Sequence, residues 1–287
     1  MKTIGVVARP DLADAASLLR ELAQWLVDRG IEVCLEEKTA ALADGSLPRS
    51  CRRAPGVDVG AVADALVVLG GDGTLLRASR LLRTSAPVLG VNFGSLGFLT
   101  EITLPELYPT LELLLADTYR SEERRLLHAS VLRGGSEHAA ADVLNDVVVT
   151  KASLARIIEL DVSVDGLFVS AFRADGLIAS SPTGSTAYNL STGGPILFPT
   201  MDAVVLTPIA PHTLSNRPIV LPGGERIDVT LRADQEVMLT MDGQVGVPLR
   251  ERDRVEVGKA RARIRLLRFD QRDFFSVLRT KLKWGER

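Results

Sequence analysis

In the first third of the chain, short apolar runs alternate with segments in which apolar residues recur every three or four positions. The apolar runs predict buried strands, and the recurring positions predict helices with one apolar face. The expected strands are residues 3–8, 31–35, 65–69 and 87–91, and the expected helices are residues 12–29, 74–83 and 105–116. This alternation predicts an α/β N-terminal domain with a mostly parallel sheet covered by helices.

Beyond residue 120 the helical pattern gives way to short runs typical of strands. The expected strands are residues 143–150, 156–164, 167–172, 177–180, 204–207, 226–231, 237–241, 245–249 and 261–268. Asp165-Gly166 and Asp242-Gly243 each separate two β-prone runs, and this dipeptide is typical of tight hairpin turns. We therefore expect an α/β domain over residues 1–120 and an all-β-rich C-terminal domain over residues 121–268. The C-terminal segment, residues 269–287, is expected to contain a helix at 273–282 and to pack back on the first domain.

The stretch 36–60 has the least regular pattern. It contains Gly45, Pro48, Pro55 and Gly56, residue types that interrupt helices and strands. We expect a long, partly mobile loop there.

Charge and cysteine content exclude several classes of protein. Lys and Arg number 34 against 36 Asp and Glu, a net charge of −2, which disfavours a nucleic-acid partner. The basic run Arg261, Arg263, Arg265 and Arg268 has no interleaved aromatic residue and resembles the solvated face of a strand. The two cysteines form neither a disulfide framework nor a zinc spacing. No apolar run reaches the roughly 18–20 residues of a membrane helix. We expect a soluble cytoplasmic protein without a membrane partner.

The sharpest motif is Gly70-Gly71-Asp72-Gly73-Thr74, which follows an apolar run and opens a predicted helix. Glycines allow the backbone to approach a ligand closely, and a helix N-terminus offers N–H groups to an anion. The motif therefore predicts a phosphate site at the carboxyl end of a parallel strand. It is neither a Walker loop nor a Rossmann fingerprint. Asp72 either caps the helix or, as we favour, takes part in the chemistry.

Two further stretches are candidates for the same site. The glycine-rich turn 90–99 carries Phe98, which either stacks on a flat ligand ring or fills the core. The stretch 172–191 is rich in hydroxyls, which predicts a polar small-molecule site, although helix capping explains some of them. Its hydroxyl residues include Ser180, Ser181, Thr183, Ser185 and Thr186.

Asn145-Asp146 interrupts an otherwise apolar expected strand, so these two polar groups must find partners or mark a site. Other chemistries have no support in the sequence. The histidines His128, His138 and His212 have no zinc-ligand spacing, and no GxSxG nucleophile elbow is present. We therefore expect no metal cluster built from protein ligands.

Taken together, GGDGT at 70–74, Asn145-Asp146, and Asp175-Gly176 followed by residues 181–188 resemble the NAD kinase family. GGDGT alone also occurs in lipid kinases, whereas the third motif is specific. The resemblance extends to Asp242-Gly243-Gln244 and to the succession of an α/β and a β-rich domain. It implies phosphorylation of the adenosine-ribose 2′-hydroxyl of NAD⁺ to NADP⁺, a phosphotransferase reaction with an alcohol acceptor. ATP would be the donor, and Mg²⁺ would arrive with it.

The resemblance also implies roles for individual residues. Asp72 would be the general base, because a ribose hydroxyl is a poor nucleophile until a carboxylate takes its proton. The phosphate loop would consist of Gly70, Gly71, Gly73 and Thr74. NAD⁺ would be bound by Asp72, Gly73, Phe98, Asn145, Asp146, Arg173, Asp175, Thr186, Ala187, Tyr188, Ser191, Ala210 and Gln244.

The implied contacts divide along the dinucleotide. Asn145 and Asp146 would hold the adenosine, with Asp146 on the ribose hydroxyls, and Ala187 would touch the middle of the dinucleotide. The adenine pocket would be lined by Phe98 and Thr186. The nicotinamide half would contact Asp175, Tyr188, Ser191 and Ala210.

Two other classes stay open at this point. One is a lipid kinase built on the same GGDGT loop, and the other is a dinucleotide-binding module without catalysis. The hydroxyl-rich stretch disfavours the first, and Asp72 disfavours the second.

The chain departs from the family in having Asp146 where Glu is more frequent and Ser181 where Thr is common. The resemblance further implies a homodimer or homotetramer in the cytoplasm.

Overall fold

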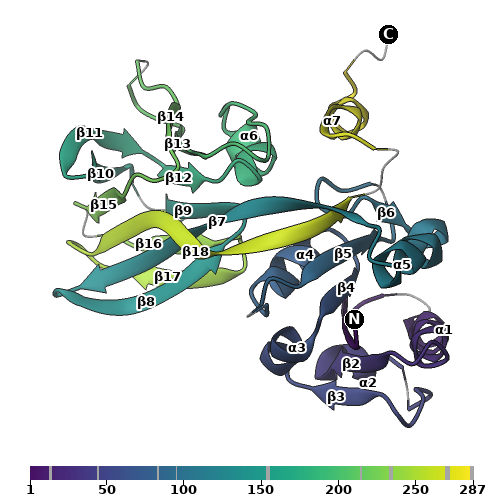
Figure 1. Ribbon diagram of the computed structural model, residues 1–287. Helices are drawn as coiled ribbons and strands as arrows, with labels where there is room; N and C mark the ends of the chain where they lie inside the picture. Colours follow the sequence, from purple (N-terminus) through teal and green to yellow (C-terminus); the bar gives the residue numbers. More distant parts are fainter. Residues whose placement is uncertain are drawn as a thin grey trace. The chain divides into compact units, whose positions relative to one another are not determined.

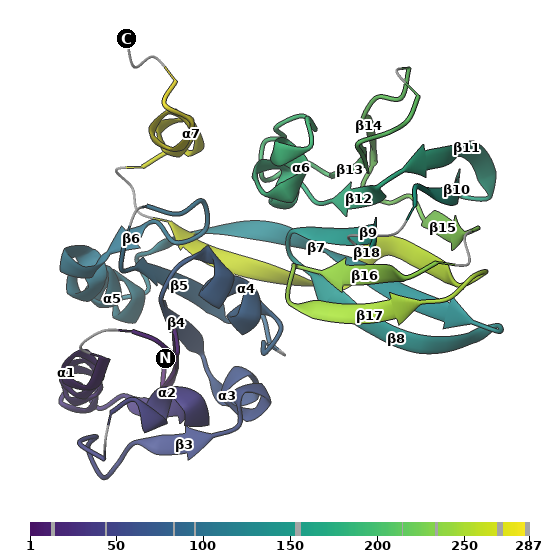
Figure 2. The same cartoon turned by 180° about the vertical axis from the view of Figure 1, so that it is seen from behind.

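The computed structural model of the chain describes residues 1–12, 15–43, 45–82, 84–94, 96–152, 156–213, 215–232, 235–268 and 272–284. The chain forms two compact units, whose elements are labelled in Figure 1 and seen from behind in Figure 2. The N-terminal unit comprises Met1–Glu123 and Ile264–Arg287, and the β-rich unit comprises Arg124–Arg263. Among the described helices, none is both long enough and apolar enough to span a membrane.

The N-terminal unit is built on a parallel sheet with the order β5-β4-β1-β2-β3. Its strands are β1 (Thr3–Ala8), β2 (Glu32–Glu36), β3 (Arg52–Ala54), β4 (Ala65–Leu69), β5 (Pro87–Asn92) and the short β6 (Ile102–Thr103). Its helices are α1 (Ala15–Val27), α2 (Glu37–Ala41), α3 (Gly56–Val62), α4 (Asp72–Ser79), the 3₁₀ turn η1 (Leu104–Glu106), α5 (Leu107–Leu115) and α7 (Phe274–Leu282). Every residue of β4 is buried, as expected for a strand covered on both faces. The predicted α/β domain with a parallel sheet is confirmed.

The prediction of a long loop over 36–60 is wrong. Apart from Asp44, which lies outside the described residues, this stretch holds α2, β3 and the start of α3. Pro55 is the N-cap of α3 and Gly56 its first residue, whereas Gly45 and Pro48 lie in the connection between α2 and β3. β3 is only three residues long and is held by pairing with β2, a long-range contact that no local pattern reveals.

The β-rich unit contains two groups of antiparallel strands. One is a six-stranded sheet, β14-β13-β12-β9-β16-β17, and the other has the order β11-β10-β15-β18, with the β7–β8 hairpin joined to β18. The strands are β7 (Arg120–Arg133), β8 (Ser136–Val143), β9 (Asp146–Lys151), β10 (Ile158–Val164), β11 (Leu167–Ala174), β12 (Gly176–Ser180), β13 (Ala203–Ile209), β14 (Ile219–Pro222), β15 (Ile227–Leu231), β16 (Val237–Met241), β17 (Val245–Leu249) and β18 (Arg254–Arg268). Of these, β7 enters the unit at Arg124 and β18 leaves it after Arg263. The helical turns are η2 (Gly184–Thr186) and α6 (Tyr188–Ser191). One apolar cluster draws residues from both strand groups, which confirms the predicted β-rich architecture.

Both predicted Asp-Gly hairpin turns are confirmed. Asp165 and Gly166 have φ of 47° and 79°, and Asp242 and Gly243 have φ of 52° and 62°, the positive values that such tight turns require. β7, β8 and β14 were not expected from the pattern, because many of their side chains are exposed and their apolar runs are short.

The basic run near the end of β18 is a solvated face only in part. Arg261 and Arg263 are exposed, as predicted, while Ile264 is buried. The prediction is wrong for Arg268, whose side chain is only 14% exposed and forms ion pairs with Glu101 and Glu122. Burial of this guanidinium is tolerated because carboxylates accompany it.

Candidate active site

The GGDGT motif forms a tight connection from β4 to α4. The N–H of Gly70 donates to the carbonyl of Val91 at 2.9 Å, which ties the loop to the end of β5. A Cβ on Gly70 would lie 2.4 Å from Oγ1 of Thr74, so a side chain at this position has no room. The loop therefore brings backbone N–H groups to the carboxyl edge of the parallel sheet, where an anion can bind.

The Asp72 carboxylate fastens the second glycine-rich turn to this loop. Its Oδ2 accepts the N–H of Phe98 at 2.8 Å. Its Oδ1 accepts the N–H groups of Leu99 and Thr100 at 3.1 and 3.0 Å and the Thr100 hydroxyl at 2.9 Å. A Cβ on Gly97 would lie 2.1 Å from Oδ1, so only glycine fits beside this carboxylate. The alternative in which Asp72 merely caps α4 is wrong, since Gly71 is the N-cap and no side chain bonds there.

A cavity of about 340 Å³ opens beside Asp72 in the N-terminal unit. Arg9 and Lys281 bring cationic groups to it, and Asp72 brings a carboxylate. Phe98 is half-buried next to Asp72 but does not line this cavity. The lining residues are Arg9, Gly71, Asp72, Asn92, Gly94, Gly97, Thr100 and Lys281.

In the β-rich unit, Asn145 lies in the bend between β8 and β9. The expectation that Asn145-Asp146 interrupts a single strand is therefore wrong, because two strands meet there. The bend is held by the Asp242 carboxylate, which accepts the N–H groups of Leu144 at 3.0 Å, Asn145 at 2.7 Å and Asp146 at 3.3 Å. In return, the N–H of Asp242 donates to the carbonyl of Asp146 at 2.9 Å. The predicted DGQ turn thus shapes the Asn145-Asp146 segment.

A cavity of about 370 Å³ lies at this bend. Burial and the neighbouring Asp242 carboxylate raise the pKa of Asp146 to about 7. The side-chain Oδ1 of Asn145 is buried and has no hydrogen-bond partner among the described residues. An unsatisfied buried acceptor is costly, so a ligand that donates a hydrogen bond here would be favoured. The lining residues are Asn145, Asp146, Val148, Thr150, Ala187, Tyr188, Thr240, Asp242 and Gly243.

The buried hydroxyls of the third motif hold the chain rather than a ligand. Ser181 Oγ donates to the carbonyl of Leu144 at 2.5 Å and accepts the N–H of Gly184 at 3.1 Å. Ser185 Oγ donates to Pro182 at 2.7 Å and accepts the N–H of Leu197 at 3.0 Å. The expectation that these two hydroxyls orient a small molecule is therefore wrong. They fix the turn that presents Ala187 and Tyr188 to the cavity.

The structure brings some of the predicted NAD⁺ contacts together and not others. Asn145, Asp146, Ala187 and Tyr188 share one cavity. Asp175 forms an ion pair with Lys151 at 2.8 Å, and the Thr186 hydroxyl donates to the carbonyl of Thr183 at 3.3 Å. Neither of these two residues lines that cavity, and the same holds for Arg173, Ser191, Ala210 and Gln244, which are exposed.

Sequence reasoning missed several residues that shape these cavities. Arg9, Thr100 and Lys281 line the cavity at Asp72, and Asp242 organises the other. The positive φ of the Asp242-Gly243 turn was predicted, but its carboxylate contacts were not. Arg9 and Lys281 lie near opposite ends of the sequence, so no local motif connects them.

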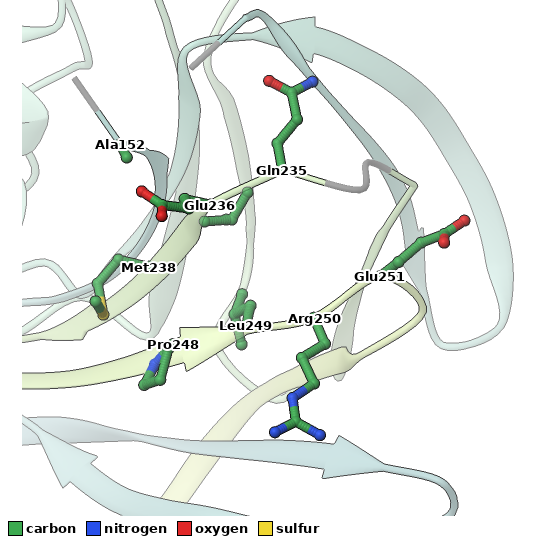
Figure 3. A pocket seen from close by; sticks show the side chains of 9 residues that line it. Ala152, Gln235, Glu236, Met238, Pro248, Leu249, Arg250 and Glu251 are labelled. Carbon is green, nitrogen blue, oxygen red and sulfur yellow. The ribbon is translucent and has the colours of Figure 1, made fainter. Parts of the chain in front are cut away.

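A larger cavity of about 800 Å³ lies elsewhere in the β-rich unit (Figure 3). It is lined by residues of β16 and β17, including Met238, Pro248 and Leu249, and by residues that flank these strands, including Glu236 and Arg250. No predicted site residue lines it. Size alone therefore does not identify the active site.

Comparison with known proteins places the whole chain in one family. The ATP-NAD kinase N-terminal domain matches residues 4–119, and the ATP-NAD kinase C-terminal domain matches residues 144–269. NAD kinases of Geotalea daltonii and Geobacter sulfurreducens are each 47% identical over the full length of both chains. The structure superposes on yeast NADH kinase complexed with NADH with a TM-score of 0.90 at 25% identity, covering 100% of this chain and 89% of that one. An Archaeoglobus fulgidus NAD kinase in complex with ATP shares the fold, with a TM-score of 0.75 at 24% identity and 98% of each chain covered. The chain therefore belongs to the ATP-NAD kinase family and is an NAD⁺ kinase that uses ATP as phosphoryl donor.

Proposed function

We propose that the cavity at Asn145 and Asp146 binds the adenosine part of NAD⁺. The observation that carries this proposal is the buried Oδ1 of Asn145, which finds no partner in the described part of the chain, beside the buried carboxylate of Asp146. A ribose offers hydroxyl donors and an adenine offers an amino group, and both would satisfy such acceptors. Tyr188 is 44% exposed on the cavity wall and offers a ring face to the dinucleotide.

Asp72 takes the proton from the 2′-hydroxyl, and Oδ2 is the atom that does so. Each carboxylate oxygen has two lone pairs. Oδ1 already accepts three donors, whereas among the described residues Oδ2 accepts only the N–H of Phe98. A general base needs an acceptor atom within hydrogen-bond reach of the hydroxyl, and Oδ2 retains that capacity.

The remaining site assignments rest on the family motifs. Gly70, Gly71, Gly73 and Thr74 hold phosphate at the start of α4. Phe98 and Thr186 face the adenine, and Ala187 touches the middle of the dinucleotide. The nicotinamide half contacts Arg173, Asp175, Tyr188, Ser191, Ala210 and Gln244.

Mg²⁺ would be bound together with ATP and would supply positive charge against its phosphates. Among the described residues, His, Cys, Asp and Glu form no group of three or more that could hold a metal. Mg²⁺ usually keeps several waters and binds through substrate phosphates plus one or two carboxylates. The cavity at Asp72 fits this requirement, because Asp72, Asn92 and Thr100, which all carry side-chain oxygen atoms, are among its lining residues. Asp72 is the residue that would hold the metal–ATP complex.

We also propose a homodimer or homotetramer in the cytoplasm, as in the bacterial members of the family. Residues 1–120 would serve the phosphates and residues 121–268 the dinucleotide. The segment 269–287 would pack back on the first domain, and the ion pair of Arg272 with Glu106 supports this.

The test is NADP⁺ formation from NAD⁺, ATP and Mg²⁺, with Asp72→Asn and Asn145→Ala compared. Asp72→Asn should lower kcat by about 10²–10⁴-fold while the Kd for NAD⁺ stays within a few-fold. Asn145→Ala should instead weaken NAD⁺ binding. An Asp72→Asn enzyme with near-normal kcat would remove Asp72 as the base, and diacylglycerol offered in place of NAD⁺ should remain unphosphorylated.

A further inference from the structure

We infer that Lys281 of α7 and Arg9, which follows β1, bind phosphate groups of the ATP donor beside Asp72. Both residues line the cavity of about 340 Å³ that also contains Gly71 and Asp72. The inference rests on the proposed role of that loop. It adds a function for the C-terminal helix, which would complete the phosphate site.

Arg9 is held against the phosphate loop by its backbone. Its N–H donates to the carbonyl of Leu69 at 2.8 Å, at the last residue of β4 before the glycines. A Cβ on Gly70 would lie 3.2 Å from Cβ of Arg9, so the arginine side chain starts directly beside the loop. Its guanidinium pairs with Asp11 at 2.9 Å, with side chains 44% and 79% exposed. Such an exposed pair is weak and can be exchanged for a phosphate.

Lys281 is placed by the anchoring of α7. Arg272 donates to both carboxylate oxygens of Glu106 at 2.8 Å, a bidentate pair with fixed geometry. Asp273 then caps α7 by accepting the N–H of Ser276 at 2.9 Å. Val277 and Leu278 are buried, so this face of the helix is fixed by packing. These contacts set the rotation of α7 and bring half-buried Lys281, in its last turn, to the cavity wall.

The charges of the cavity favour a polyphosphate. Its described lining contains two cationic side chains and the single carboxylate of Asp72. A carboxylate alone would repel a triphosphate, so nearby cations are needed to hold the donor next to the base. The diphosphate of NAD⁺ has the same chemistry but less charge. We assign the two cationic side chains to the triphosphate of ATP. Separate KM values for ATP and NAD⁺ distinguish this assignment from binding of the NAD⁺ diphosphate.

The experiment compares Lys281→Gln and Arg9→Gln with the control Arg279→Gln. Arg279 is an exposed cation on the same helix and does not line the cavity. We expect each cavity variant to raise the KM for ATP about ten-fold, the usual size of one lost charge-assisted contact, with the KM for NAD⁺ within two-fold. Calorimetric binding of ATP without NAD⁺ should weaken by a similar factor. Inorganic tripolyphosphate, used as a competitor of ATP, should lose inhibition in parallel, and Arg279→Gln should behave as wild type.

Lys281→Arg keeps the charge and should retain most ATP affinity, which separates loss of charge from damage to α7. Unchanged ATP affinity in both Gln variants, with melting temperatures preserved, would overturn the inference. A rise in the KM for NAD⁺ alone would also overturn it, because it would mean that the two cations bind the dinucleotide. In either case the loss of kcat in Asp72→Asn would still stand, so the proposed function is tested separately.

Discussion

Oδ2 of Asp72 accepts the backbone N–H of Phe98 at 2.8 Å. The residue proposed as general base is therefore also the anchor of the turn that follows β5. Loss of this carboxylate would break the hydrogen bonds between the GGDGT loop and the turn at residues 98–100. The chemical role of Asp72 must therefore be separated from its structural role by variants that keep the carboxylate.

Gly97→Ala is such a variant. The new Cβ would lie 2.1 Å from Oδ1 of Asp72 and 2.4 Å from Oγ1 of Thr100, so the carboxylate must move. We expect kcat to fall by about 10²-fold, the lower range for misplacing a general base. Steady-state kinetics measure this. Gly258→Ala is the control, because its Cβ would meet nothing within 4 Å. A normal kcat in Gly97→Ala would show that the position of Asp72 is not critical.

Asp146→Asn should stabilise the ligand-free protein at alkaline pH. The pKa of Asp146 is about 7 in the folded state, above the ordinary 3.8, because of burial and the Asp242 carboxylate. The folded state thus binds this proton more tightly, and stability is lost as pH rises from about 4 through 7. Asn carries no such proton, so at pH 8 the variant should gain about 1–3 kcal/mol in free energy of unfolding. Denaturant unfolding at pH 4.5 and pH 8 measures this gain in the free energy of unfolding. An equal gain at both pH values would contradict a raised pKa of Asp146.

The same position should show the opposite effect on function. Asp146→Asn should lower kcat/KM for NAD⁺ by roughly ten- to a hundred-fold, since charge-assisted bonds contribute about 1.5–3 kcal/mol. Asp146→Glu restores the residue more frequent in the family and should retain more activity than Asn. Kinetics of both variants decide this. Equal activity of Asn and wild type would remove Asp146 from the site.

Glu106→Gln should destabilise the protein at neutral pH. Burial of Glu106 by itself raises its pKa, but hydrogen bonds from Arg272 and Thr103 outweigh burial and hold the pKa at about 2. The stabilisation is fully present above the unfolded pKa near 4.5 and is lost as pH falls towards 2. We expect a loss of about 1–3 kcal/mol at pH 7 that disappears near pH 2. Unfolding curves across this range provide the measurement, with Glu112→Gln, a more exposed residue of α5, as control. A pH-independent loss would argue against the ion pair.

Tyr188→Ala should raise the KM for NAD⁺ more than it lowers kcat. A ring contact made equally in the ground and transition states contributes uniform binding. Phe198→Ala is a matched control, because Phe198 has the same 44% exposure and does not line the cavity. An unchanged KM for NAD⁺ in Tyr188→Ala would show that this ring does not contact the dinucleotide.

Removal of Mg²⁺ by EDTA should stop NADP⁺ formation without lowering the melting temperature of the ligand-free protein. A metal that arrives with ATP contributes to catalysis and not to folding. Calorimetry with and without EDTA checks this. A marked drop in melting temperature would reveal a structural ion.

Elements that depend only on neighbouring residues could be predicted from the sequence. β1, β4, β16 and β17 have the predicted limits, because buried strands need continuous or alternating apolar positions. Asp165-Gly166 and Asp242-Gly243 form the predicted turns, since their conformational preferences are local. The GGDGT motif likewise lies at the predicted end of a parallel strand.

The tertiary structure was needed to find which distant groups meet. It showed that Ser181 and Ser185 bond to backbone instead of facing a ligand, and that Asp72 binds the turn at Phe98 instead of capping α4. It also brought Arg9 and Lys281 to one cavity. The residue type determines which hydrogen bonds a side chain can form, but the packing of the whole chain determines which partners lie within reach.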